Sequence, residues 1–191
     1  MNKEISITFT VAGDPSAMSP EELAALEKDA IEIGIPFSDP VAETPDVQKA
    51  NLRALGAGAK GGAVEAALAL AKDLRPKAAA KIVLYSYYNP VFRFGLDRFF
   101  NQCADAGVDG VTLTDRPYEE RGEAAPCAKK YGIALLSTIA TTDISRAKLI
   151  AESSEGYLRI EPVGSKAERD AVIAAVKDVL PYAVCQLSQE A

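Results

Sequence analysis

One strand and the loop after it hold the residues of this sequence that are best suited to acid–base chemistry. Glu32 is the single charged residue of the apolar stretch 31–35, and three further acids follow in a proline-containing loop: Asp39, Glu43 and Asp46. A carboxylate in a buried strand costs free energy unless another group pairs with it or uses it. The loop could bring a second acid over the same spot, and two such acids could transfer protons. A salt-bridged core glutamate beside a solvated acidic loop explains the same residues equally well, so both interpretations stay open.

The histidine and cysteine content limits which side chains could transfer protons or bind a metal. The 191 residues include no histidine, so proton transfer falls to carboxylates, Lys, Tyr or Cys. Three cysteines lie far apart without metal-ligand spacing: Cys103, Cys127 and Cys185. We therefore expect reduced thiols, a cytoplasmic location, and neither a metal nor a cofactor.

The charge pattern argues against nucleic acid and against membranes as partners. The formal net charge is −6 and no basic cluster stands out, so polyanions have no evident binding surface. No apolar run approaches the roughly 18 residues that a membrane-spanning helix needs. The opening stretch alternates apolar residues with Ser and Thr, which predicts a strand rather than a signal peptide. A small molecule is the ligand we expect.

Strand-like and helix-like segments alternate along the whole chain. Strands are predicted at residues 5–11, 29–35, 81–87, 108–114, 133–139, 157–160 and 182–187. Helices are predicted at residues 20–28, 46–55, 61–74, 95–106, 118–131, 142–153 and 166–180. This alternation implies parallel strands joined by right-handed crossovers, in an α/β fold that binds ligands at the carboxyl ends of its strands. No linker divides the chain, so residues 1–191 are predicted to form one domain.

Local signals fix several element ends. Ser19 and Glu22 form a capping box around Pro20, which predicts a helix start. Asn89-Pro90 is predicted to end the third strand, and Thr142 to cap a helix. The glycine-rich stretch 56–61 spells G-x-G-x-x-G, but it follows a helix instead of a strand, so we interpret it as a helix–helix connection.

Five motifs and one helix segment carry a resemblance to a known family. The motifs are Ala12-Gly13-Asp14-Pro15, Glu32-Ile33-Gly34-Ile35-Pro36-Phe37-Ser38-Asp39-Pro40, Gln48-x-Ala50-Asn51-Leu52-Arg53, Tyr87-Tyr88-Asn89-Pro90 and Ala106-Gly107-Val108-Asp109-Gly110, and the helix segment is Lys148-Leu149-Ile150-Ala151. Across roughly residues 5–160 the sequence resembles the tryptophan synthase alpha subunit. The resemblance implies a (β/α)8 TIM barrel that cleaves indole-3-glycerol phosphate to indole and glyceraldehyde 3-phosphate. It also implies a pyridoxal-phosphate-dependent beta subunit as the partner that receives indole.

The resemblance assigns roles to individual residues. Glu32 matches the family's general acid–base glutamate, which transfers a proton to C3 of the indole. Glu43 falls where the family has an aspartate that binds the indole nitrogen, and Thr44 replaces the glycine after it. Phe9 and Tyr87 match aromatic positions that line the substrate pocket. The resemblance thus predicts Glu32 and Glu43 as catalytic and the two aromatic residues as substrate-binding.

The sequence also departs from the family pattern. Complete barrels run to about 250 residues, whereas this sequence ends with the seventh predicted strand. We therefore expect an incomplete barrel of about seven strands that lacks strand eight, its helix and the phosphate-binding turns. Residues 161–165 lead almost directly into a helix, where the family has a mobile loop that closes over the substrate.

Polar residues stand at strand ends where the family tends to carry apolar or tyrosine residues around indole. They are Thr112, Thr114, Thr138, Arg159 and Glu161, and Thr112, Thr114 and Arg159 are predicted to bind substrate. Arg159 could pair with Glu32 or Glu161, or hold an anionic ligand. A structural ion network in a former active site remains the alternative.

Three functions follow as hypotheses. The first is a divergent relative of the lyase that acts on, or binds, a small and more polar molecule. The alternatives are an authentic minimal carbon–carbon lyase and a non-catalytic subunit that binds a protein partner through the loop 36–46. Because an incomplete sheet leaves exposed edges at its first and last strands, we also expect a homo-oligomer that covers the opening.

Overall fold

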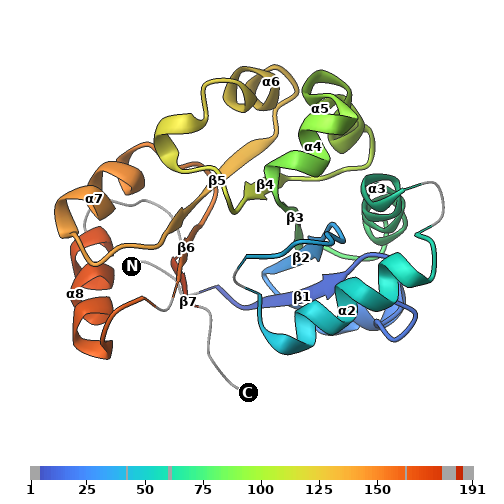
Figure 1. Ribbon diagram of the computed structural model, residues 1–191, viewed down its shortest axis with the longest axis horizontal. Coiled ribbons are helices and arrows are strands. Elements are labelled where there is room, and N and C mark those ends of the chain that lie inside the picture. Colours follow the sequence, from blue (N-terminus) through green and yellow to red (C-terminus); the bar gives the residue numbers. More distant parts are fainter. Residues whose placement is uncertain (1–4, 42, 60–61, 162, 178–183, 187–191) are drawn as a thin grey trace. The chain divides into compact units, whose positions relative to one another are not determined.

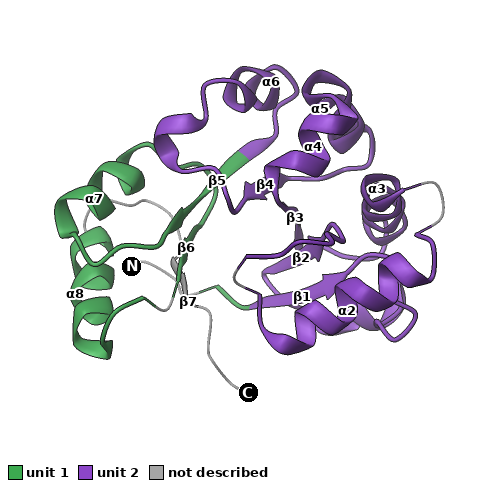
Figure 2. Ribbon diagram, viewed as in Figure 1, with its two compact units in different colours: residues 1–6, 135–191 green, residues 7–134 purple. Residues whose placement is uncertain are grey.

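Seven strands and eight α-helices alternate along the part of the chain that the computed structural model describes, residues 5–41, 43–59, 62–161, 163–177 and 184–186 (Figure 1). They belong to two units, one of residues 7–134 and the other of residues 1–6 and 135–191 (Figure 2). Two units of this kind can belong to one folding domain, so the single domain stays a prediction. No helix within the described ranges is long and apolar enough to cross a membrane.

The larger unit contains four parallel strands that pair in chain order: β1 (Ile7–Val11), β2 (Ala30–Gly34), β3 (Lys81–Ser86) and β4 (Gly110–Leu113). Its helices are α1 (Pro20–Ala25), α2 (Pro45–Gly56), α3 (Ala63–Leu74), α4 (Tyr88–Phe94), α5 (Leu96–Asp105) and α6 (Ala124–Lys130). A short 3₁₀ helix, η1, spans Tyr118–Glu120. Helices therefore follow each strand, as the sequence pattern predicts.

The smaller unit repeats this arrangement. Strand β5 (Ala134–Ile139), whose first residue is the last of the larger unit, pairs in parallel with β6 (Leu158–Ile160), and β6 pairs in parallel with β7 (Val184–Gln186). Helices α7 (Ile144–Glu152) and α8 (Lys166–Lys177) connect them. The α/β class with parallel strands is thus confirmed, while the ends of the predicted segments 166–180 and 182–187 lie outside the described residues.

Strand register divides the side chains of the β1–β4 sheet between two faces. One face carries buried aliphatic residues, Ile31, Ile33, Ile82, Leu84 and Val111, which crossover helices of such a fold cover. The opposite face, which we call the Glu32 face, carries two successive rows of register partners. The lower row is Phe9, Glu32, Val83 and Gly110, and the upper row is Val11, Gly34, Tyr85 and Thr112.

The third strand ends before Asn89-Pro90 as predicted, but one helix was not predicted and one helix cap was predicted wrongly. Asn89 and Pro90 lie in the first turn of α4, a helix that the sequence did not indicate, because a proline there lacks only an N–H that a helix start leaves unbonded anyway. The N-cap of α7 is Asp143, not Thr142, and its carboxylate accepts from the N–H groups of Ser145 and Arg146. The capping box of Ser19 and Glu22 is confirmed.

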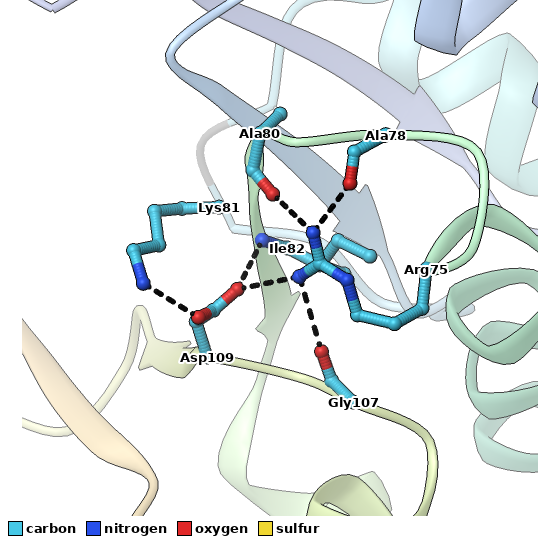
Figure 3. A network of polar contacts seen from close by, with 7 residues as sticks. All are labelled: Arg75, Ala78, Ala80, Lys81, Ile82, Gly107 and Asp109. Atoms are coloured by element: carbon cyan, nitrogen blue, oxygen red, sulfur yellow. Dashed lines mark hydrogen bonds and ion pairs between the residues drawn. The ribbon is translucent and has the colours of Figure 1, made fainter.

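A charged network ties β3 to β4 at their amino ends (Figure 3). Asp109 lies directly before β4 and accepts hydrogen bonds from Arg75 Nη1 at 2.9 Å, Lys81 Nζ at 2.8 Å and the Ile82 N–H at 2.9 Å. The Arg75 guanidinium also donates to three carbonyl oxygens, those of Ala78, Ala80 and Gly107. A planar five-donor guanidinium suits this arrangement, because one side chain binds a carboxylate and several carbonyls at once.

Gly107 makes room for this arginine. Its φ is +73°, and a Cβ at this position would lie 2.6 Å from Arg75 Cγ. Both the left-handed backbone and the close approach favour glycine. The Gly107 and Asp109 of the fifth motif therefore serve the amino ends of the strands, away from the carboxyl ends where a ligand would bind.

A second ion pair holds α2 to the loop after β1 and gives a prediction for acid stability. Arg53 donates to Asp14 from Nε at 2.8 Å and from Nη2 at 2.7 Å. These hydrogen bonds lower the pKa of Asp14, although burial opposes the shift. A carboxylate with a lowered folded-state pKa stabilises the fold above its ordinary pKa, and this contribution is lost as the pH falls through the lowered value.

Asp14→Asn is therefore expected to destabilise the protein by about 1 kcal/mol at pH 7, since Arg53 is partly exposed and the pair is screened. The difference from the parent should shrink as the pH falls below 4. Urea unfolding across this range measures it. A difference that is the same at pH 3 and pH 7 would contradict the assignment.

Candidate acid–base site

Glu32 lies at the centre of the Glu32 face. It is the middle residue of β2 and only 1% of its surface is exposed. Its register partners on that face are Phe9 of β1 and Val83 of β3. A carboxyl group between an aromatic and an aliphatic neighbour is typical of groups that handle protons in a water-poor setting.

Gly34, two residues after Glu32 on the same face of β2, leaves room for an aromatic pair. A Cβ at Gly34 would lie 2.8 Å from Phe9 Cζ, so a larger residue would displace the Phe9 ring. That ring meets Tyr85 edge-on, with centroids 5.5 Å apart. The glycine of the Glu-x-Gly motif therefore has a steric role beside the site.

Tyr85 was not among the predicted site residues. It is the register partner of both Gly34 and Thr112, and it lies two residues before Tyr87 on an extended backbone. The alternation of side chains along a strand was the available signal, because residues two apart share a face.

Tyr87 connects the loop after β2 to the end of β3. Its hydroxyl donates to Glu43 Oε1 at 3.2 Å and accepts from the Val41 N–H at 3.0 Å. Its ring stacks on Phe37 with centroids 4.9 Å apart. One side chain thus fixes three points of the loop and positions the second predicted acid.

Thr44 explains how the loop tolerates the loss of the family's glycine. Its φ is −63° and ψ is 155°, an ordinary extended conformation, and its side chain caps α2 by accepting from the Val47 N–H. The backbone of Glu43 is held as well, because its carbonyl accepts from Gln48 Nε2 at 2.9 Å. The substitution replaces a flexible residue with a helix cap.

Tyr87→Phe tests this anchoring. Removing the hydroxyl deprives the Val41 N–H of its acceptor while the ring can still stack on Phe37. We expect the amide of Val41 to exchange with deuterium about tenfold faster, as loss of one hydrogen bond implies. Tyr88→Phe is the matched control, since Tyr88 bonds Glu123 instead. Equal Val41 exchange in the parent and both variants would exclude the anchoring role.

The two predicted threonines lie at the carboxyl end of β4. Thr112 is fully buried, and its Oγ1 and that of Thr114 have no hydrogen-bond partner among the described residues. Thr112 belongs to the upper row of the Glu32 face. Thr114 directly follows β4, and its N–H donates to the Ser86 carbonyl at 3.0 Å. The larger unit therefore contains six of the predicted site residues. Phe9, Glu32 and Thr112 lie on the Glu32 face, and Glu43, Tyr87 and Thr114 lie in the segments that follow the strands.

Arg159, the remaining predicted residue, belongs to β6 in the smaller unit. It is 4% exposed, pairs in register with Thr138, and its Nε lies 3.7 Å from Glu161 Oε1. The contact with Glu161 is one of the alternatives that the sequence left open. Arg159 and Glu32 belong to different units.

Two observations in the described residues concern metal ligands and one of the thiols. No three His, Cys, Asp or Glu side chains in the described ranges are grouped as metal ligands. Burial raises the pKa of the Cys103 thiol, which keeps it protonated and a poor nucleophile.

Parallel strands that alternate with helices, with acids and aromatic residues at their carboxyl ends, define a protein of the (β/α)-barrel class. The family model described as tryptophan synthase alpha chain matches residues 1–182. The chain belongs to the tryptophan synthase alpha chain family. The family that the motifs indicated is thereby confirmed.

Individual relatives show how much of the family's length this chain covers. It is 38% identical over 181 residues to the tryptophan synthase alpha chain of Lacticaseibacillus casei, covering 92% of this chain and 67% of that protein. It is 41% identical over 156 residues to that of Alkaliphilus metalliredigens, covering 80% of this chain and 58% of the relative. The chain thus spans about 58 to 67% of the length of these two relatives.

Solved structures agree on the fold. A tryptophan synthase complex from Pyrococcus furiosus matches with a TM-score of 0.84 and 30% identity, over 97% of this chain and 78% of that chain. The alpha subunit from Legionella pneumophila matches with a TM-score of 0.80 and 29% identity, over 96% and 72%. The TIM-barrel-like fold is therefore confirmed, and the described residues account for seven strands of such a barrel.

Proposed function

We propose that the larger unit carries a proton-transfer site of the tryptophan synthase alpha type, which acts on a small molecule in a carbon–carbon lyase reaction. One observation carries this proposal: Glu32, 1% exposed, lies beside Phe9 on the face that also holds Tyr85. A buried acid next to aromatic side chains suits a reaction in which a ring carbon gains or loses a proton.

Glu43 supports the proposal as a second acid. Its carboxylate is held by Tyr87, so it is positioned before any ligand arrives. A carboxylate that accepts a hydrogen bond from a ring N–H stabilises the positive charge that protonation of the ring produces. Glu32 and Glu43 would thus divide proton transfer and charge stabilisation between them.

With indole-3-glycerol phosphate as substrate, the step balances as follows. The Glu32 carboxyl group gives its proton to C3 of the indole ring. The hydroxyl on the adjacent side-chain carbon then loses its proton to the Glu32 carboxylate. The bond between that carbon and C3 breaks, its electron pair restores the ring, and the O–H pair forms the aldehyde. The products are indole and glyceraldehyde 3-phosphate.

Exchange of the indole C3 proton with deuterium tests proton transfer by itself. Indole carries no phosphate, so the assay does not depend on residues outside the described face. We expect the protein to accelerate loss of the C3 proton signal in deuterium oxide well above the buffer rate, as followed by proton NMR. Indole-3-glycerol phosphate is then assayed for indole release. Exchange at the buffer rate at every indole concentration would refute the proposed function.

A second candidate, a subunit that binds a protein partner, is favoured by Val41. This residue is 84% exposed while Tyr87 binds its backbone N–H, so the loop presents an apolar side chain from a fixed backbone. Calorimetry with the purified beta chain of a relative tests this candidate. Val41→Asp should weaken binding at least tenfold, and absence of binding by the parent would remove this candidate.

A further inference from the structure

Two hydroxyl groups at the carboxyl end of β4 lack the hydrogen bond that the buried hydroxyls of Ser86 and Ser154 make. Ser86 donates to the Tyr87 carbonyl at 2.8 Å, and Ser154 bonds both Ser137 at 2.6 Å and the Ile150 carbonyl. Thr112 Oγ1 and Thr114 Oγ1 have no such partner within the described residues, and Thr138 Oγ1 on β5 of the smaller unit is a third hydroxyl without one. A buried hydroxyl without a hydrogen bond costs folding free energy, so an unsatisfied pair at one strand end calls for an explanation.

The backbone near these threonines offers no ready acceptor. Thr112 lies in the parallel ladder between β3 and β4, opposite Tyr85, and the Thr114 N–H continues the ladder by donating to the Ser86 carbonyl at 3.0 Å. Ladder carbonyls are already engaged and lie in the plane of the sheet, whereas the side chains point away from it. The hydroxyls therefore face whatever occupies the Glu32 face.

Their location beside the proposed catalytic group links them to the ligand. Thr112 belongs to the row directly above Glu32, and its register partner Tyr85 contacts the ring of Phe9. A molecule that lies against these aromatic rings and reaches Glu32 has Thr112 at its edge. Thr114, two residues further along the chain, extends this polar edge past the strand end.

We propose that Thr112 and Thr114 form a hydrogen-bonding subsite that selects a ring carrying a carbonyl or hydroxyl group over an unsubstituted indole. The inference rests on the proposed function, because it assumes that a ligand occupies the Glu32 face. It assigns the substrate class: a small planar molecule more polar than indole. A site built to bond a ring oxygen rejects the analogue without it far more strongly than a hydrophobic wall does.

Calorimetric titration with matched rings tests the subsite. The probes are indole, its lactam oxindole and the hydroxyindoles that are substituted on the benzene ring. We expect at least one oxygenated ring to bind the parent protein tenfold or more tightly than indole does. Thr112→Val should abolish this preference by weakening binding of the oxygenated ring at least tenfold, and Thr112→Ser, which keeps the hydroxyl, should restore it. Thr8→Val, on the opposite face of β1, is the matched control.

The outcomes separate the subsite from the acid–base proposal. Three results would overturn the subsite: equal affinities for all rings, no binding of any ring, or a preference that persists in both Thr112→Val and Thr114→Val. In each case the hydroxyls would be assigned to hydrogen bonds with structural water. A preference that depends on Thr112, in a protein with no C3 proton exchange, would support the subsite and refute the proposed function. Thermal unfolding of Thr112→Val checks that the near-isosteric variant folds.

Discussion

Glu32→Gln is expected to slow exchange of the indole C3 proton by about 1,000-fold, the usual scale for loss of a general acid–base group. Glutamine preserves the shape of the side chain but cannot give up or accept a proton under these conditions. Glu32 is the middle residue of β2 and is only 1% exposed. Because of this burial, an acid at the protein surface cannot readily take over its proton transfer. Proton NMR of indole in deuterium oxide measures the effect directly.

Two controls make this result specific to proton transfer. Glu43→Gln should slow exchange less than Glu32→Gln does and should also weaken binding of the ring, because Glu43 is proposed to bind the ring nitrogen and stabilise the charge but not to carry the proton. Circular dichroism and thermal unfolding of Glu32→Gln should match the parent, so that lost activity is not lost structure. Exchange within tenfold of the parent in a folded Glu32→Gln variant would exclude Glu32 as the proton carrier.

Arg75→Met is expected to destabilise the protein by about 2 to 3 kcal/mol. The variant removes the hydrogen bonds of Arg75 to Asp109 and to three carbonyl groups (Figure 3). A partly buried carboxylate or carbonyl group that loses a charged partner lowers the stability of the fold more than the loss of an exposed ion pair does. The partial exposure of Arg75 limits this loss of stability. Urea unfolding gives the difference in free energy.

Arg75→Lys is the matched control for this second variant. Lysine keeps the charge but not the planar set of donors, so it should recover only part of the stability. Exchange of the indole C3 proton by the folded variant should equal that of the parent, because the network lies at the amino ends of β3 and β4. A full recovery by lysine would show that charge alone, without the geometry of the guanidinium, stabilises this end of the sheet.

Much of the fold was evident in the sequence because strands and helices depend on short-range patterns. Apolar runs at regular intervals predicted the parallel strands, and the single acid in one of them pointed to Glu32. The capping box of Ser19 and Glu22 could be predicted because its two residues are only three positions apart. The wrong cap at Thr142 and the unpredicted helix α4, which begins soon after β3, also concern element ends, where neighbouring residues compete for the same role.

The contacts that give the candidate site its form could not be predicted from spacing. Tyr87 lies 44 residues from Glu43 and 46 from Val41, and Arg75 lies 34 from Asp109. Such pairs depend on strand register, and a shift of one residue would send each strand side chain to the opposite face. The sequence by itself determined the family, the strand–helix order and the acid in β2. Only the tertiary structure decided which hydroxyls share the face of Glu32 and which residue positions Glu43, because side-chain partners far apart in the chain are chosen by packing.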